Sequence, residues 1–157
     1  MTRLFGRAPA GERVVGSVPR NYGPNVTMLG ALSLQGLQTV MTVNGATDAD
    51  VFRTYVKQVL GPTLIPGDIV VMDNLQAHKA VGVQQALARR GARLVYLPPY
   101  SPDLSPIEPC WSKVKTALRH AKARTRAALD TAIADVMVTV SLTDARGWFK
   151  HCGYSLQ

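Results

Sequence analysis

A proline-rich stretch, residues 97–108, constrains the fold of this chain more than any other segment. It contains four prolines, which fix φ and remove backbone N–H donors. We therefore expect a stiff, non-helical connector between two regular elements. Beyond it, apolar residues recur every three or four positions, the period of a helix with one buried stripe. These residues are Ile107, Trp111, Val114, Leu118 and Ala121.

Glu108 lies beside this apolar stripe and not within it. Steps of three or four residues from Glu108 lead to side chains that would share one helix face. A carboxylate at the head of a basic row suits a site that handles phosphates. The row consists of Ser112, Lys115, Arg119, Lys122 and Arg126.

Length and composition indicate one globular domain spanning residues 1–157. The chain is 46% apolar and 18% charged, which excludes a wholly disordered protein. Its net charge of +8 favours an anionic partner. Nucleic acid is preferred to a membrane, because no segment approaches the ~20 apolar residues of a span. Charge alone is also compatible with a basic protein that binds no nucleic acid, because many basic proteins bind none.

The two cysteines, Cys110 and Cys152, show no metal-like CxxC spacing, and no apolar leader segment precedes them. They are therefore interpreted as reduced intracellular thiols, one of them packed beside Trp111, and a zinc site is not expected.

A strand, helix, strand unit precedes the connector. Residues 69–72 form a short apolar run that ends at Asp73 and is typical of a buried parallel strand. A helical pattern over 77–90 stops at Gly91, and a second strand is expected over 93–97. Such crossovers are right-handed, so the two strands should be parallel. Asp73 and the connector then leave the sheet at one edge, where ligands of open α/β sheets usually bind, and Glu108 can face Asp73.

The segments on either side complete the expected fold. Residues 13–18 suggest a short strand, and residues 25–33 and 37–43 predict an antiparallel hairpin. Further helices are expected over residues 51–59, 129–140 and 143–154. Asp48 and Asp50 precede the first of these helices and are interpreted as favouring its N-terminus. The glycines of residues 6–11 lack the Lys and Ser/Thr of a phosphate-cradling loop, so a nucleotide-binding motif is rejected.

Asp73 and Glu108 support two interpretations. Carboxylates from different elements, meeting beside a basic row, can hold divalent metal ions for phosphodiester chemistry, with Mg²⁺ as the natural guest. Alternatively, Ser105 and Glu108 form a capping box with Pro106 at the first helical position, and Asp73 with Asn74 merely forms a turn. Spacing alone leaves both interpretations open.

Two groups of residues carry a resemblance to a known family. Met72-Asp73-Asn74 with His78-Lys79, and the run 97–108 followed by 111–115, closely resemble DDE transposases of the mariner-like bacterial insertion-sequence type. The spacing between Asp73 and Glu108 is typical of that branch, and the resemblance covers nearly the whole chain. It implies a ribonuclease-H-like α/β fold, a mixed sheet with flanking helices. It also implies Mg²⁺ as the cofactor, with Mn²⁺ as a substitute, and DNA strand cleavage and transfer at element ends.

The resemblance assigns roles residue by residue. Asp73 and Glu108 match the second and third catalytic acids and would also bind the metal, whereas Asn74 and His78 match motif positions without an assigned role. The implied partners are DNA of transposon ends and target, and a second copy of the chain in a homodimer. The implied location is the bacterial cytoplasm, at the nucleoid. The DNA contacts are expected at Lys113, Lys115, Arg119, Lys122 and Arg126.

The sequence departs from the family at its first catalytic aspartate, which the family carries on its opening strand. Asp48 and Asp50 come after the hairpin and do not match it, residues 1–11 resemble the family's segment just beyond that strand, and the helix-turn-helix region is absent. The chain thus resembles a catalytic domain that lacks its N-terminal part, and we expect weak metal binding and little or no catalysis from it alone. The first strand lies beside the Asp73 strand in the family's sheet, so residues 13–18 or a second chain would have to cover its place. Otherwise we expect a marginally folded protein.

Two hypotheses from other classes remain. The chain can be a non-catalytic DNA-binding or interaction fragment that competes with full-length transposase, or an unrelated metal nuclease suggested only by the acids and the charge.

Overall fold

The computed structural model describes residues 5–16 and 24–155. Within them, four strands form two separate two-stranded sheets, surrounded by helices. The first sheet is the hairpin of β1 (Val26–Ser33) and β2 (Gly36–Asn44), which pair antiparallel as predicted. Gly36 takes a φ of 102° at the end of the turn, a conformation that favours glycine.

The hairpin is followed by α1 (Ala49–Tyr55), which continues through a π turn (Val56–Leu60) and a 3-10 turn (Gly61–Thr63). Asp48 is the N-cap of α1, because its carboxylate accepts hydrogen bonds from the backbone of Asp50 and Val51. Asp50 lies in the first turn and pairs with Arg53 at 2.6 Å. The prediction that these two acids serve a helix N-terminus is confirmed.

The second sheet pairs β3 (Ile69–Met72) with β4 (Arg93–Tyr96) in parallel, as predicted. The expectation that β3 is buried on both faces is wrong. Val70 and Met72 point to the core, but Ile69 is 55% and Val71 39% exposed. In the described part of the chain β3 pairs with β4 alone, and no helix covers its second face enough to bury these two side chains.

The helix predicted over residues 77–90 is broken into a 3-10 turn, η3 (Gln76–Lys79), and a short α2 (Val83–Ala88). The break falls at Gly82, whose φ of 89° lies outside the helical region. Gly91, at φ 73°, follows the end of α2 and turns the chain into β4. The apolar spacing therefore predicted the buried side of α2 but not its length.

The C-terminal half contains α3 (Ile107–Ala121), α4 (Arg126–Met137) and α5 (Leu142–His151). The apolar stripe predicted for α3 is confirmed at Val114 and Leu118, which are buried, whereas Ala121 at the helix end is exposed. Val140 is buried but lies beyond α4, which is shorter than its predicted span. Cys110 is fully buried in the same core, and Trp111 packs against that core, as expected.

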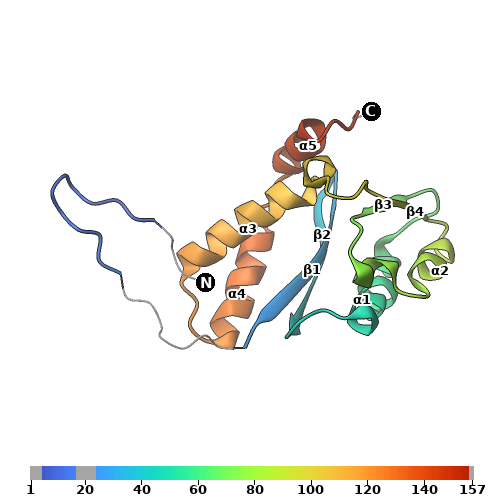
Figure 1. Ribbon diagram of the computed structural model, residues 1–157, viewed down its shortest axis with the longest axis horizontal. Coiled ribbons are helices and arrows are strands. Elements are labelled where there is room, and N and C mark those ends of the chain that lie inside the picture. The colour runs from blue at the N-terminus through green and yellow to red at the C-terminus, as the bar shows by residue number, and fades with distance from the viewer. Residues whose placement is uncertain (1–4, 17–23, 156–157) are drawn as a thin grey trace.

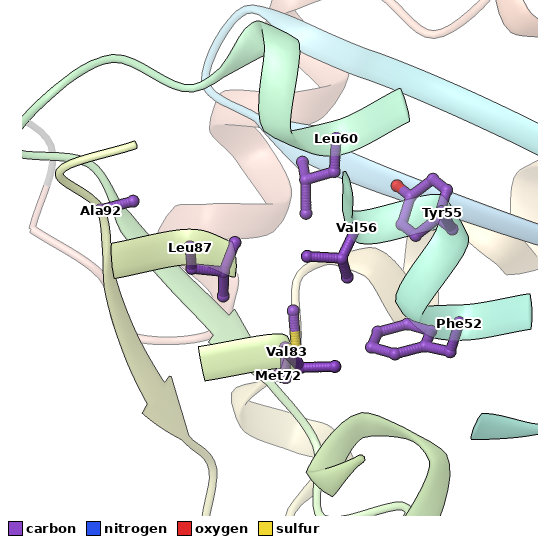
Figure 2. Close-up of a cluster of buried hydrophobic side chains, with 8 residues drawn as sticks. All are labelled: Phe52, Tyr55, Val56, Leu60, Met72, Val83, Leu87 and Ala92. Carbon is purple, nitrogen blue, oxygen red and sulfur yellow. The ribbon is translucent and has the colours of Figure 1, made fainter. Parts of the chain in front are cut away.

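The hairpin separates two hydrophobic cores. Leu29 and Met41 pack against the cluster of α1, β3 and α2, which Figure 2 shows in close-up. Met28 and Val40 pack against the cluster of α3 and α4 on the other side. Figure 1 accordingly shows the hairpin in the middle, with α3 and α4 on one side and α1, α2, β3 and β4 on the other. The first cluster consists of Phe52, Tyr55, Val56, Leu60, Met72, Val83, Leu87 and Ala92.

The N-terminal segment departs from prediction. Residues 13–16 are exposed and form no strand, and residues 17–18 of the predicted strand lie outside the described residues. In Figure 1 the segment from residue 5 to 16 runs away from the helices and sheets. Among the described helices, none is long and apolar enough to cross a membrane.

Candidate active site

Asp73 directly follows β3, at the edge of the sheet where β3 and β4 both end. Its Oδ1 atom accepts a hydrogen bond from the backbone N–H of Leu75 at 3.0 Å and lies 2.5 Å from Nδ1 of His78. The side chain is 48% exposed. The turn interpretation therefore accounts for Oδ1 of Asp73. The other carboxylate oxygen, Oδ2, has no hydrogen-bond or ion-pair partner within residues 5–16 and 24–155.

Asn74 ties this turn to the connector. Its side-chain amide donates to the carbonyl oxygen of Leu97, and the Leu97 N–H donates to the carbonyl of Met72 at 2.8 Å. The connector is non-helical as predicted except for one 3-10 turn, η4 (Pro102–Leu104), where the hydroxyl of Tyr154 donates to the Leu104 carbonyl at 2.9 Å. The connector thus starts beside Asp73 and is anchored again just before Glu108.

Glu108 is exposed in the first turn of α3. The predicted capping box is not formed, because Pro106 occupies the N-cap position and no side chain caps the helix. The Glu108 N–H instead donates to the carbonyl of Ser105 at 3.1 Å. Its carboxylate has no hydrogen bond or ion pair in the described part of the molecule, so the capping interpretation is wrong.

A capping box does occur at the start of α5. Ser141 accepts from the Asp144 N–H at 3.1 Å, and the Asp144 carboxylate accepts from the Ser141 N–H at 2.9 Å. The same carboxylate binds Nζ of Lys113 at 2.6 Å, and this ammonium also donates to the carbonyl of Thr139 at 2.8 Å. The hydrogen bond from Lys113, with those from Ser141, lowers the pKa of Asp144 to about 2. The spacing of Ser141 and Asp144 was the sequence signal for this box.

The basic residues separate into two groups. Lys113 is held by Asp144, and Arg126 belongs to α4, where it binds Asp130 at 2.8 Å and also contacts Thr42 and Asn44 on β2. The expectation that Arg126 continues the row on the face of Glu108 is wrong. The helix α3 ends at Ala121.

Lys115 and Arg119 lie on α3 at the spacing predicted from Glu108, and Lys122 follows as the C-cap, with a φ of 51°. No ion pair engages these three side chains in the part of the chain that the structure describes. Lys115 and Lys122 are exposed and Arg119 is partly exposed. The predicted row therefore persists in shortened form, as a set of three cationic side chains available to an anionic partner.

The donor set can be compared with what a divalent ion needs. Mg²⁺ and Mn²⁺ bind carboxylate oxygens and commonly complete their coordination with water and substrate phosphate. Oδ2 of Asp73 and the carboxylate of Glu108 are donors of this kind. Across residues 5–16 and 24–155, no three His, Cys, Asp or Glu side chains gather closely enough to hold a metal ion. Each of these two carboxylates therefore fits an ion that takes its other ligands from water and phosphate.

Comparison with solved structures places the fold in the ribonuclease-H-like class of mixed α/β domains. The Mos1 mariner paired-end complex with Mn matches with a TM-score of 0.72 and 12% identity, over 100% of this chain and 52% of that chain. The Mos1 strand transfer complex matches with a TM-score of 0.69 and 14% identity, over 100% of this chain and 51% of the other. The chain thus spans about half the length of these transposase chains. The predicted ribonuclease-H-like α/β class is confirmed, but in the described residues the antiparallel and parallel strand pairs form two separate sheets and not one mixed sheet.

The family follows from the sequence itself. A family model described as DDE superfamily endonuclease matches residues 1–130. The chain belongs to the DDE superfamily endonuclease family, as its resemblance indicated. No curated protein matches it. Membership in this family removes the hypothesis of an unrelated metal nuclease.

Proposed function

We propose that the chain is the catalytic-domain portion of a bacterial insertion-sequence transposase, which cleaves and transfers DNA strands at element ends. The family and the fold support this assignment. The observation that carries this assignment is the placement of two carboxylates with unpartnered oxygens. Asp73 lies beside the start of the anchored connector and Glu108 at its end, and each has at least one oxygen without a partner among the described residues.

In this proposal Asp73, through Oδ2, and Glu108 hold Mg²⁺, or Mn²⁺ in its place. A bound divalent ion activates water and stabilises a leaving oxygen in phosphodiester chemistry. The chain itself holds the two carboxylate ligands of this ion in position. Leu75 and His78 hold one oxygen of Asp73, and Asn74 joins the Asp73 turn to the start of the connector that leads to Glu108. Because the site offers only two carboxylates among residues 5–16 and 24–155, we propose weak metal binding and little or no cleavage by this chain alone.

The shortened basic row supplies the DNA contacts in this proposal. Lys115, Arg119 and Lys122 would bind phosphates of transposon-end or target DNA, whereas Lys113 and Arg126 keep their protein partners. A protein with these partners would act at the bacterial nucleoid, and a homodimer would bring two element ends together.

A second candidate is a non-catalytic DNA-binding fragment that competes with full-length transposase. One observation favours it. The described part of the chain offers three unengaged cationic side chains on and next to α3 but no group of three metal ligands. This candidate predicts the same DNA affinity with and without metal.

Metal binding and DNA binding decide between the two. Mn²⁺ affinity is measured by electron paramagnetic resonance for the wild type, Asp73→Ala, Glu108→Ala and, as a control, Asp135→Ala, which removes an exposed acid from α4. The proposal expects weaker Mn²⁺ binding in the first two variants only, and tighter DNA binding in the presence of Mn²⁺. Wild-type Mn²⁺ affinity in Asp73→Ala and Glu108→Ala, together with DNA affinity that does not depend on metal, would favour the competing fragment.

Nicking of a plasmid that carries the element ends tests the inactivity claim separately. Cleavage that requires Mg²⁺ or Mn²⁺ and is abolished by Asp73→Ala would refute inactivity while supporting the catalytic assignment.

A further inference from the structure

The imidazole of His78 packs against α1, and the His78 backbone is held by two hydrogen bonds. Its ring packs on the buried ring of Phe52 in α1, with centroids 4.3 Å apart and an interplanar angle of 36°. Its backbone N–H donates to the carbonyl of Leu75 at 3.0 Å, and its own carbonyl accepts the hydroxyl of Tyr96, from β4, at 3.0 Å. The side chain is 19% exposed. α1 therefore positions the ring, and the hydrogen bonds with Leu75 and with Tyr96 of β4 position the backbone that carries it.

The fixed ring meets Asp73 through one specific pair of atoms. Nδ1 of His78 is buried and lies 2.5 Å from Oδ1 of Asp73, and it has no other polar partner in the described residues. The two atoms lie at ion-pair distance, without the direction of a regular hydrogen bond. The Leu75 N–H binds the same oxygen at 3.0 Å.

Two partners on one oxygen determine the rotation of the carboxylate. With Oδ1 engaged by His78 and Leu75, Oδ2 is the oxygen left to point away from the turn. Carboxylate ligands of metals are commonly oriented by such outer partners, whose loss weakens metal binding by about 10- to 100-fold.

We propose that His78 is a positioning residue that sets the orientation of Asp73 and leaves Oδ2 for a divalent cation. This proposal rests on the proposed function for the cation, whereas the contact itself belongs to the metal-free protein. His78 acts through Asp73 and does not touch the reacting atoms.

Two substitutions separate the nitrogen from the ring. His78→Phe keeps an aromatic ring against Phe52 but removes Nδ1, whereas His78→Asn loses the ring and places an amide where Nδ1 stood. His151→Phe makes the same ring change at an exposed histidine at the end of α5 and serves as the control. Mn²⁺ affinity and the thermal midpoint are measured for all four proteins. We expect His78→Phe to bind Mn²⁺ about 10-fold or more weakly, His78→Asn to recover most of the loss, and His151→Phe to match the wild type.

A structural role alone predicts a different pattern. Equal losses of Mn²⁺ affinity in His78→Phe and His78→Asn, in step with their thermal midpoints, would overturn the proposal. Wild-type Mn²⁺ affinity in His78→Phe would also overturn it.

A second readout does not depend on metal binding. The imidazole nitrogen signals of His78, recorded by NMR without metal at one pH, should shift in Asp73→Asn because the anion facing Nδ1 is removed. Signals that do not respond to Asp73→Asn overturn the proposal. Mn²⁺ binding that is unchanged in Asp73→Ala contradicts the proposed function and not the His78 contact. The NMR result then decides the role of His78 by itself.

Discussion

The indole of Trp111 in α3 lies against Gly30 in β1, so that a Cβ on Gly30 would stand 2.9 Å from Cη2 of the ring and 3.0 Å from the carbonyl oxygen of Thr39. The helix that carries Glu108 at its start is therefore seated on the hairpin at a residue without a side chain. This contact sets how closely α3 approaches the hairpin.

Replacing Gly30 by Ala should destabilise the protein by about 1 to 3 kcal/mol, because the added methyl group overpacks the contact with Trp111. Gly147→Ala is the matched control. Its Cβ would meet nothing within 4 Å, and an alanine within α5 should stabilise the helix by about 0.5 to 1 kcal/mol. Urea unfolding of both variants measures the difference, and a Gly30→Ala variant as stable as the wild type would contradict the close seating of α3.

The second prediction concerns a buried pair of hydroxyls. Thr39 on β2 and Tyr55 in α1 share a hydrogen bond of 2.7 Å, and burial raises the pKa of Tyr55 to about 12. Tyr55→Phe leaves the Thr39 hydroxyl without this partner and should cost about 1 to 3 kcal/mol. The double variant Thr39→Val, Tyr55→Phe removes both polar groups and should recover part of that loss. Urea unfolding of the three proteins tests this, and additive losses in the double variant would show that the pair is not coupled.

The third prediction is the acid dependence of the Lys113–Asp144 pair. The pKa of Asp144 in the folded protein is lowered to about 2 from an ordinary value of 3.8. A lowered carboxyl pKa means stabilisation that is present above pH 3.8 and lost as the pH falls through 2. Lys113→Met should therefore reduce the free energy of unfolding at pH 6 by no more than about 1 kcal/mol, because the pair is partly exposed. The difference from the wild type should shrink between pH 4 and pH 2.

Chemical unfolding at pH 6, 4 and 2 tests this pair, with Lys115→Met as the control because Lys115 has no ion pair in the described chain. A difference between Lys113→Met and the wild type that does not change with pH would show that Lys113 acts through packing and its hydrogen bond to Thr139, and not through the charge of Asp144.

The parts of this fold that sequence predicted well are those with a local signal. The hairpin was visible from two apolar runs around a glycine turn, and the parallel pair of β3 and β4 followed from a strand, helix, strand order. The burial of β3 was not predictable in this way. A four-residue apolar run is the same whether one face or two faces are covered, and the layer that would cover Ile69 and Val71 is a property of the tertiary structure.

In the candidate site, too, features with a local sequence signal were predicted and features set by tertiary structure were not. Asp73 and Glu108 were predicted from a strand end, a proline connector and a resemblance, and their role as metal ligands stays a prediction. The end of the basic row was missed, because α3 ends at Ala121 and its C-cap Lys122 is left-handed, with no glycine or proline between Lys122 and Arg126 to mark the stop. The contact of His78 with Phe52 joins distant segments of the chain and left no local pattern.

The fourth prediction concerns DNA binding by the shortened row. If Lys115 and Arg119 bind phosphates, each substitution by Ala should reduce the slope of log affinity against log salt by about 0.9 on duplex DNA of any sequence. Lys113→Ala is the control, because its ammonium is already held by Asp144 at 2.6 Å. Fluorescence anisotropy at several salt concentrations measures the slopes. An unchanged slope in the Lys115→Ala, Arg119→Ala double variant would identify the row as a solvated helix face.

The fifth prediction concerns β3, whose only strand partner in the described chain is β4, so that its other edge has unpaired N–H and C=O groups. Its outer face also exposes Ile69 and Val71. An unpaired edge beside exposed apolar side chains is a template for pairing with another chain. The protein should therefore self-associate as its concentration rises, in keeping with the marginal folding expected from the sequence. Val71→Lys should reduce this association several-fold, because a charge on the strand disfavours strand addition.

The control for this prediction is Val81→Lys, which changes an even more exposed valine in the turn before α2, outside any strand. Sedimentation velocity over a series of concentrations compares the two variants with the wild type. Association reduced by Val71→Lys and not by Val81→Lys places the contact at β3. Equal reduction in both variants would mean that net charge alone governs association, and a wild-type protein that stays monomeric at every concentration would show that the β3 edge is protected in solution.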